Sequence, residues 1–426
     1  MMRVLSALLL AGCFSTDPTP TVEAVPPAAV EAAPAAPTAF DAELAALDEK
    51  IAWNLKRSET LGGSWLVLES AAGLLMERAR LSGDYNDYAR AESLLTEAFS
   101  LAPERSGPFM TRAQLNYTLH RLDAVDPDLA QASKRLLLNN HEQGSIALLR
   151  ANLALQRGDY AAAKNGYDEA LALSRSMSAV CSVAVFEWKT GDTKTAEARF
   201  DEAEDMLIGD SATRRAWLHL QRGLIDLDHG RLDDAMAHYR TAESILPGHW
   251  LIEEHIAEVL TATDQADAAL RVYGAVIERT GNPEFMDAVA EILAQREDAS
   301  APQWVARARE AHDARLALFP EAAAGHALDH YLAHASPAEA LALAQANLDT
   351  RPNTEARIGL AAALLTAGQL EAAAEQLAIA EASPWVAADI HTLAAELALA
   401  TGDRDAATAA LGRAQSIDAT ATVDGL

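Results

Sequence analysis

The sequence predicts an all-α fold, a solenoid of about ten stacked helical hairpins without a sheet. Apolar residues recur at helical spacing along most of the chain, as they do in the stretch 217–227. A glycine ends such a run at Gly158, Gly191, Gly230, Gly368 and Gly402, and 33 residues separate the first two. An alanine follows each glycine at the fifth position, and another follows seven positions later. A constant period of this length is typical of helix–turn–helix units that stack on one another.

The clearest single unit is 216–249, in which Ala235 and Ala242 flank the bulkier Tyr239. This pattern resembles the tetratricopeptide repeat, a helix–turn–helix unit of 34 residues. In that family, small residues let the two helices approach, and an aromatic side chain fills the gap to the next hairpin. The resemblance covers about four-fifths of the chain. It implies one right-handed superhelix with a concave groove, which is an architecture and not a specific function.

Residues 1–12 have the pattern of a bacterial export signal, since Arg3 precedes an apolar run that is too short to persist as a membrane span. The run ends in Leu10-Ala11-Gly12-Cys13, which resembles the lipobox of bacterial lipoproteins. That resemblance implies that the Cys13 thiol is acylated and that Cys13 becomes the N-terminus. The alternatives are an ordinary signal peptide and a misassigned start with a chance cysteine. Phe14, in place of the aspartate that retains enterobacterial lipoproteins in the inner membrane, favours the outer membrane facing the periplasm.

Next come a linker, a capping helix and the solenoid. Residues 13–39 carry the lipid anchor and are rich in proline and alanine, so we expect an extended tether. An apolar stripe along 40–63 predicts a helix that caps the first hairpin. We expect the solenoid to span 64–420, and the chain from Asp418 through the tail 421–426 to be frayed.

Within the solenoid the hairpins differ in regularity. A degenerate first hairpin is expected at 64–104, and 106–143 predicts a hairpin with an enlarged turn because Pro108 and Pro127 interrupt it. The regular hairpins are expected at 144–177, 178–210, 216–249, 250–283, 321–353, 354–387 and 388–420. Between them, 284–320 lacks a turn glycine and carries a polar insert at 296–300, yet Pro320 ends it in register.

Charge and cysteine content limit the partners. The chain has 62 acidic and 34 basic residues and a net charge of −28, which argues against nucleic acid or an anionic membrane surface as the main partner. We therefore expect membrane contact through the N-terminal lipid only. With Cys13 acylated, Cys181 has no intrachain partner, and its apolar surroundings predict a small buried hydrophobic residue.

The tetratricopeptide family binds partners on a face formed by recurring positions of the first helix of each hairpin. In this sequence that face contains Leu148, Leu155, Val185, Trp188, Trp217, Leu220 and Leu224. An apolar groove with tryptophans would bind a helix or an extended peptide of another protein. The alternative is that these side chains are buried, because polar residues occupy the expected core positions of 216–249.

Four polar residues at or beside those core positions form a second candidate site: Arg222, Asp226, His255 and Glu258. Charged groups near a helix interface need partners. An internal ion-pair network or a register slip of one or two residues would explain them, and so would a pocket for a polar ligand.

Three histidines, His326, His330 and His334, step by four residues and therefore share a helix face. The outer two lie roughly 12 Å apart along the axis, so one ion cannot bind all three. His326 and His330 are weak candidates for a metal site, which would need Asp329 or a group on a neighbouring helix. Surface or packing histidines are the simpler interpretation, and we expect no metal and no other cofactor.

No catalytic signature for hydrolase, phosphate-loop or dinucleotide chemistry occurs, and continuous repeats leave no room for a separate catalytic domain. The sequence therefore predicts a non-enzymatic, lipid-anchored periplasmic scaffold that binds other envelope proteins or peptides. The alternative is an envelope sensor that binds a small ligand or a metal through the clusters named above.

Overall fold

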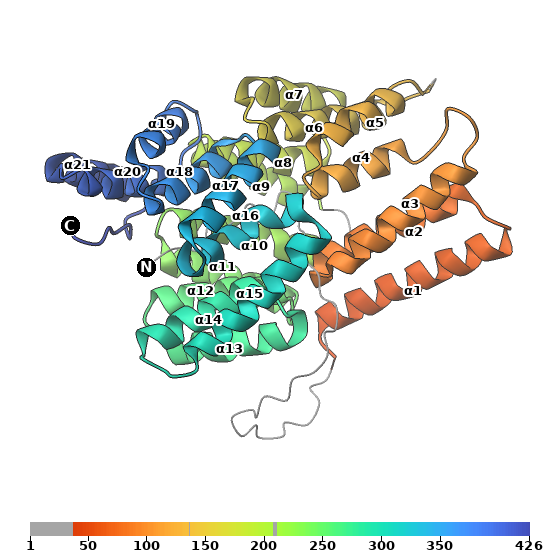
Figure 1. Cartoon of the computed structure of the whole chain (residues 1–426). Helices are drawn as coiled ribbons and strands as arrows, with labels where there is room; N and C mark the ends of the chain where they lie inside the picture. The colour runs from red at the N-terminus through yellow and green to blue at the C-terminus, as the bar shows by residue number, and fades with distance from the viewer. Residues whose placement is uncertain (1–36, 136, 208–210) are drawn as a thin grey trace.

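A computed structural model describes residues 37–135, 137–207 and 211–426. Cys13, the signal 1–12 and most of the linker 13–39 lie outside the described residues. Over the described ranges the chain forms helices and no strand (Figure 1). The first helix, α1 (Ala39–Thr60), begins with a capping box in which Thr38 and Asp41 satisfy each other's backbone and side-chain groups.

Ten hairpins follow α1, and each consists of two antiparallel helices. They are α2 (Trp65–Ser82) with α3 (Tyr85–Leu101), α4 (Phe109–Thr118) with α5 (Val125–Ala132), α6 (Asn140–Gln156) with α7 (Tyr160–Leu173), α8 (Met177–Lys189) with α9 (Thr193–Asp205), α10 (Ala212–Asp228) with α11 (Leu232–Ile245), α12 (Trp250–Ala262) with α13 (Ala266–Thr280), α14 (Pro283–Gln295) with α15 (Ala301–Leu318), α16 (Pro320–His334) with α17 (Pro337–Thr350), α18 (Thr354–Thr366) with α19 (Leu370–Glu381), and α20 (Ala388–Ala400) with α21 (Arg404–Ile417). The predicted all-α solenoid of tetratricopeptide-like hairpins is confirmed.

Small residues occupy the tightest helix contacts, as the repeat pattern predicts. The alanines that follow the five turn glycines are fully buried, with no exposed surface at Ala163, Ala170, Ala196, Ala203, Ala235, Ala242, Ala373, Ala380, Ala407 and Ala414. The aromatic rings of Tyr167, Phe200 and Tyr239 lie between them, with at most 1% exposure. A methyl group is the largest side chain that such close packing accepts, so these positions determine the spacing of each hairpin.

Three turns reach the same backbone conformation without glycine. His120, Asp264 and Glu297 have φ angles of 57°, 59° and 56°, which is the left-handed region that glycine usually occupies. Glu297 lies in the polar insert of 284–320, which explains how this hairpin keeps its register. The expected enlarged turn of 106–143 contains a short 3-10 helix at Leu122–Ala124.

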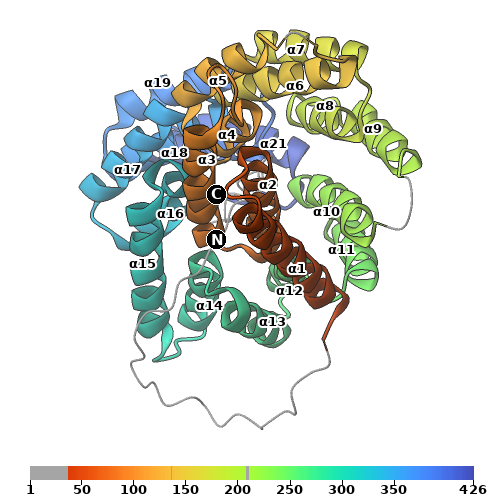
Figure 2. The same cartoon turned by 90° about the vertical axis from the view of Figure 1, so that its right-hand side faces the viewer.

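The hairpins follow one another around a ring, and after one full turn the later helices run beside the earlier ones (Figure 2). Helices α16–α21 therefore form a second course of the superhelix beside the first course. Turns within the early hairpins contact loops between the late hairpins along a line that we call the seam. Its members are Gln156, Tyr160, Lys189 and Gly230 in the first course, and Arg351, Asn353, Thr354, Val386 and Asp418 in the second.

The seam is held by buried polar contacts. Gln156 Oε1 accepts hydrogen bonds from Arg351 Nε at 3.0 Å and from Asn353 Nδ2 at 3.2 Å. All three residues are at most 7% exposed. Farther along, Gly230 lies so close to Asp418 that an added Cβ would come within 2.3 Å of Asp418 Oδ1. Buried polar groups must be paired to be tolerated, so these contacts determine the register between the courses.

The first two helices, α1 and α2, make similar contacts with the region around the start of α12. Trp250, at the start of α12, donates its indole N–H to the Leu81 carbonyl at 2.7 Å. The Phe40 N–H donates to the Pro247 carbonyl at 3.4 Å. The ring of Phe40 also packs against His249 with centroids 4.8 Å apart. Helix α1 is thus attached to both its neighbour α2 and the loop before α12.

The expectation of a frayed C-terminal end is wrong. Asp418 is 1% exposed, and Ala421 and Val423 are also buried. Val423 packs in a cluster with Ala395, Ala407 and Ala410 of the last hairpin. The tail is ordered because it covers the end of the solenoid and supplies Asp418 to the seam.

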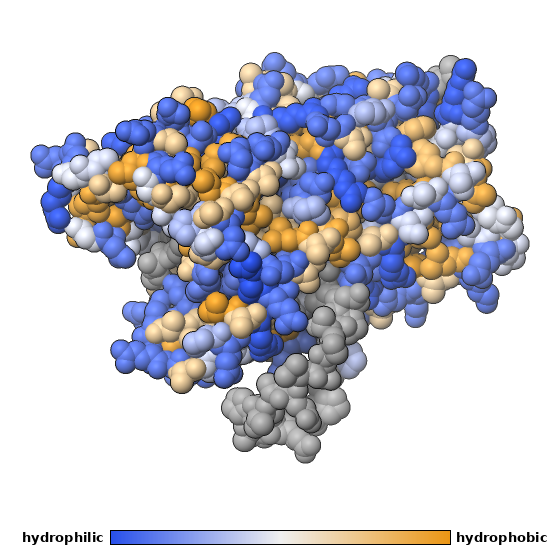
Figure 3. All heavy atoms as spheres, viewed as in Figure 1, coloured by the Kyte–Doolittle hydropathy of each residue, from blue (hydrophilic) through white to orange (hydrophobic). Residues whose placement is uncertain are grey.

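Hydrophilic side chains cover most of the face in Figure 3, and apolar side chains reach the surface in short stretches between them. Among the described residues, no helix combines the length and apolar character required to cross a bilayer.

Candidate functional site

A cavity of about 260 Å³ lies where the two courses meet. The first course contributes the ends of α8 and α10, and the second contributes the loop before α20 and the end of α21. The Val386 N–H donates to the Lys189 carbonyl at 2.8 Å and joins the two walls. The complete lining is Trp188, Lys189, Gly191, Thr193, Leu227, Asp228, His229, Glu258, Glu355, Ile358, Trp385, Val386, Ala387, Ala388, Asp389, Ser416 and Ile417. We call this space the seam cavity.

Lys189 is the one lysine or arginine in the lining, and this residue is only 7% exposed. Its Nζ lies 3.7 Å from the ring centroid of Trp188 and 6.0 Å from that of Trp385. It also pairs with Asp228 Oδ2 at 2.5 Å. Aromatic faces attract cations, most strongly where water is excluded. The walls of the seam cavity therefore already stabilise one positive charge.

Carboxylates outnumber that lysine. Asp228, Glu258, Glu355 and Asp389 all line the seam cavity, so its four carboxylates and one ammonium give a net charge of −3 when the carboxyls are ionised. Two of the four have partners outside the cavity lining: Glu258 with His255 at 3.1 Å, and Glu355 with Arg351 at 2.6 Å. A space with tryptophan walls and four carboxylates fits a cationic group better than an anionic or purely apolar one.

His229 has one tautomer defined by its neighbours. Its Nδ1 lies 2.7 Å from the Ile225 carbonyl, which can only accept, so Nδ1 carries the proton. Nε2 lies 3.5 Å from the Thr193 hydroxyl oxygen. This side of the seam cavity presents an imidazole and a hydroxyl.

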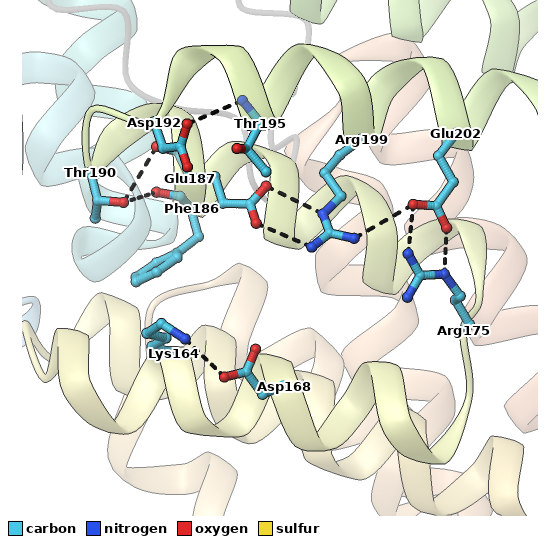
Figure 4. A network of polar contacts seen from close by, with 10 residues as sticks. All are labelled: Lys164, Asp168, Arg175, Phe186, Glu187, Thr190, Asp192, Thr195, Arg199 and Glu202. Atoms are coloured by element: carbon cyan, nitrogen blue, oxygen red, sulfur yellow. Dashed lines mark hydrogen bonds and ion pairs between the residues drawn. The ribbon is translucent and has the colours of Figure 1, made fainter.

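An ion-pair network fixes the end of α8 (Figure 4). Trp188 and Lys189, which line the seam cavity, belong to the same end of this helix. Glu187, the preceding residue, pairs with Arg199 of α9 at 3.3 Å. Arg199 also contacts Glu202 at 3.5 Å, and Glu202 accepts a hydrogen bond from Arg175 Nη2 at 2.7 Å. Burial raises the pKa of Glu187, and the hydrogen bond from Arg199 opposes that rise. The network therefore connects both helices of the hairpin to the preceding loop.

The seven residues of the expected groove lie inside the solenoid. Leu155, Val185, Trp188 and Leu220 are buried, and Leu148, Trp217 and Leu224 are half-buried. Trp217 packs against the ring of Phe200 with centroids 6.4 Å apart. Only Trp188 of the seven lines the seam cavity. Four of the seven side chains are therefore in the core, and three remain partly accessible.

The expected polar site does not form one cluster. Arg222 pairs with Asp201 and Glu204, at 2.7 Å each. Asp226 pairs with Arg231 at 2.6 Å. These contacts are the internal ion-pair network that the sequence left open as one interpretation, and they are separate from the remaining two members, His255 and Glu258.

His255 and Glu258 do meet, and Glu254 joins them. His255 Nδ1 lies 3.2 Å from a Glu254 oxygen and 3.1 Å from a Glu258 oxygen. The Tyr239 ring stacks on the imidazole, with centroids 5.4 Å apart. Burial raises the pKa of Glu254 to about 8, even though the adjacent imidazole opposes that rise. The pKa of His255 is raised, because attraction to Glu254 and Glu258 exceeds the effect of burial.

The two histidines considered for a metal have different partners. His326 Nδ1 pairs with Glu284 at 2.8 Å, whereas His330 Nδ1 contacts Asp287 Oδ1 at 2.7 Å. Asp287 also accepts from His312 Nε2 at 2.8 Å. Burial acts to raise the pKa of Asp287, but the hydrogen bonds from His312 and His330 hold it below its ordinary value. Sequence reasoning missed Asp287 and His312, which belong to other helices.

Comparison with known proteins gives similarity to solved structures only. No family model and no curated protein matches the sequence. A tetratricopeptide repeat protein from Parabacteroides merdae is 17% identical, with a TM-score of 0.36, over 57% of this chain and 94% of its own. Yeast Tom70 is 14% identical, with a TM-score of 0.35, over 88% of this chain and 96% of its own. PilF from Pseudomonas aeruginosa is 18% identical, with a TM-score of 0.29, over 49% of this chain and 95% of its own.

Proposed function

We propose that this protein is a non-enzymatic scaffold that binds a basic segment of another protein at the seam cavity. The observation that carries the proposal is the pair Trp188 and Trp385, which face a lysine ammonium in a space with excess carboxylate. A lysine or arginine side chain of a partner would meet the carboxylates of the lining and the indole ring of Trp385. The net charge of −28 would speed the approach of a basic partner.

The proposal includes a location in the bacterial cell envelope. The lipobox-like sequence ending at Cys13 supports a lipid anchor, and Phe14 supports the outer membrane facing the periplasm. The proline-rich residues that follow would hold the solenoid away from the lipid surface while confining it nearby. Partners would then be other envelope proteins or peptides, reached at a high local concentration.

Photo-crosslinking in the native bacterium tests this function. A benzophenone amino acid replaces Val386 at the rim of the seam cavity, and a control replaces Leu318; both side chains are 39% exposed. We expect protein adducts at position 386 whose crosslinked peptides contain lysine or arginine. Glu258→Gln, which removes a carboxylate from the lining, should reduce them.

Identical capture at positions 386 and 318 would count against the seam cavity as the binding site. Adducts at 386 through segments without basic residues, or adducts insensitive to Glu258→Gln, would contradict the proposed recognition of a cation. Mass spectrometry of the crosslinked peptides distinguishes these outcomes.

A further inference from the structure

A second cluster, which shares no residue with the lining of the seam cavity, joins three consecutive helices. Asp287 comes from α14, His312 from α15 and His330 from α16, so the cluster links the seventh hairpin to the eighth. Both imidazoles direct a ring nitrogen at the same carboxylate, at 2.8 Å and 2.7 Å. The side chains of both histidines are 1% exposed, and that of Asp287 is 20% exposed.

The donor set is that of a transition-metal site. One potential ligand atom from each residue lies within 4.8 Å of the other two. Ligands of a tetrahedral zinc ion lie about 2.0–2.2 Å from the metal, and therefore about 3.4 Å from one another. The two contacts to Asp287 would each have to lengthen by roughly half an ångström, which small side-chain rotations supply. Two neutral imidazoles and one carboxylate suit zinc and the neighbouring divalent ions, and disfavour calcium and magnesium.

A fourth donor lies at the solvent side of this cluster. His334 is one turn beyond His330 on α16, and the two rings are 5.1 Å apart between centroids. His334 is exposed, whereas His330 is buried. It could therefore complete a tetrahedral set and receive an ion from solvent, while the three inner ligands hold it. The acidic chain would favour the approach of a cation.

We propose that Asp287, His312 and His330 bind one divalent transition metal, zinc in the first instance, with His334 as the outer ligand. This site goes beyond the proposed binding of a basic segment and does not depend on it. Binding requires that the ring nitrogen facing Asp287 gives up its hydrogen. A neutral imidazole does so by carrying its proton on the other ring nitrogen, and an imidazolium does so by releasing one proton to solvent. The ion would lock α14, α15 and α16 together at the joint between two hairpins.

The test uses the full chain, first stripped with a chelator and then titrated with zinc or cobalt ions. We expect about one ion per chain by elemental analysis, and the visible absorption of tetrahedral cobalt. His312→Gln and His330→Gln should each weaken binding at least about 100-fold, the upper end of the cost of losing even a supporting group. His334→Gln should weaken it less.

His326→Gln is the matched control, because His326 lies one turn before His330 on α16 and pairs with Glu284 instead. It should leave binding unchanged. The titration is repeated with Cys13→Ser to remove that thiol as a ligand. Metal-free variants are checked by circular dichroism, and zinc should raise the thermal midpoint of the parent chain but not of a His312→Asn variant that remains folded.

Absence of stoichiometric binding by the stripped parent chain would overturn the proposal and leave a closed hydrogen-bonded triad. Undiminished binding in both His312→Gln and His330→Gln would overturn it as well. Equal loss in His326→Gln would place the ion elsewhere on α16. None of these results changes the crosslinking expected at the seam cavity.

Discussion

Tyr160 and Thr354 are 194 positions apart in the chain and hold each other by two hydrogen bonds. The Tyr160 hydroxyl donates to Thr354 Oγ1 at 2.6 Å and accepts from the Thr354 N–H at 3.0 Å. Thr354 Oγ1 in turn donates to Ser383 Oγ at 2.8 Å. One phenol hydroxyl thus joins the third hairpin to the ninth, at one end of the seam.

Removing that hydroxyl should weaken the seam. Tyr160→Phe leaves the buried Thr354 groups without their partner, which should lower the free energy of unfolding by about 1–3 kcal/mol in a urea titration. Tyr239→Phe is the matched control, because the Tyr239 hydroxyl is buried and has no hydrogen-bond partner among the described residues. Equal effects of the two substitutions would show that the seam contact contributes nothing specific.

Trp188→Ala should destabilise the folded protein. Trp188 is 5% exposed and packs with Val185 and Phe200, so its removal should cost about 3 kcal/mol or more and lower the thermal midpoint. Trp53, at 57% exposure, supplies the control, and Trp53→Ala should cost less than about 1 kcal/mol. An unchanged midpoint for Trp188→Ala would support an open groove instead.

Glu254 should make stability fall as pH rises. Its folded pKa of about 8 is above the ordinary value near 4.5, so between those values the folded state keeps a proton that the unfolded state has lost. The raised pKa of His255 acts in the same sense above pH 6.5. From pH 5.5 to 8.5 we expect Glu254→Gln to remove about 3 kcal/mol of this decline, measured by chemical denaturation.

Glu371 is exposed, and Glu371→Gln serves as the control for that pH series. A pH profile of Glu254→Gln that parallels the parent chain would mean that Glu254 does not retain its proton in the folded state.

Cys181 should be unreactive in the folded protein. Burial raises the pKa of its thiol to about 12, so roughly one molecule in ten thousand carries the thiolate at pH 8. In a Cys13→Ser background Cys181 is the single cysteine, and iodoacetamide should modify it only after denaturation. Rapid modification of the folded chain, followed by mass spectrometry, would show that the α8 core opens.

Cys13→Ser tests the anchor. If Cys13 is the acylated residue, this substitution should abolish fatty-acid labelling and move the protein from the membrane fraction to the soluble fraction. A variant that stays with the membranes would show that another segment holds it there.

The sequence was sufficient to predict the local architecture, because hairpin spacing depends on nearby residues. The period of Gly158 and Gly191 and the buried Ala163 and Ala196 are examples. Closure into two courses was not predictable, since it results from small rotations that accumulate from hairpin to hairpin. For the same reason, no pattern in the sequence indicated that Trp385 would lie near Lys189.

The candidate metal cluster was also predictable only in its local part. The spacing of His326 and His330 indicated one helix face, and the need for a ligand from a neighbouring helix was anticipated. Which helix would supply it depended on how α14 and α15 pack against α16. A comparison of His and Asp positions on consecutive predicted helices would have brought His312 to attention.

The seam also has a consequence for the time course of synthesis. Translation at 5–20 residues per second would separate the appearance of Tyr160 from that of Thr354 by roughly 10–40 s. During that interval the early hairpins lack the loops that later cover their turns, and Gln156 and Lys189 face solvent without Asn353 and Val386. A nascent chain therefore exposes the first-course side of the seam, which the complete protein buries. A chaperone would bind the nascent chain at this exposed side.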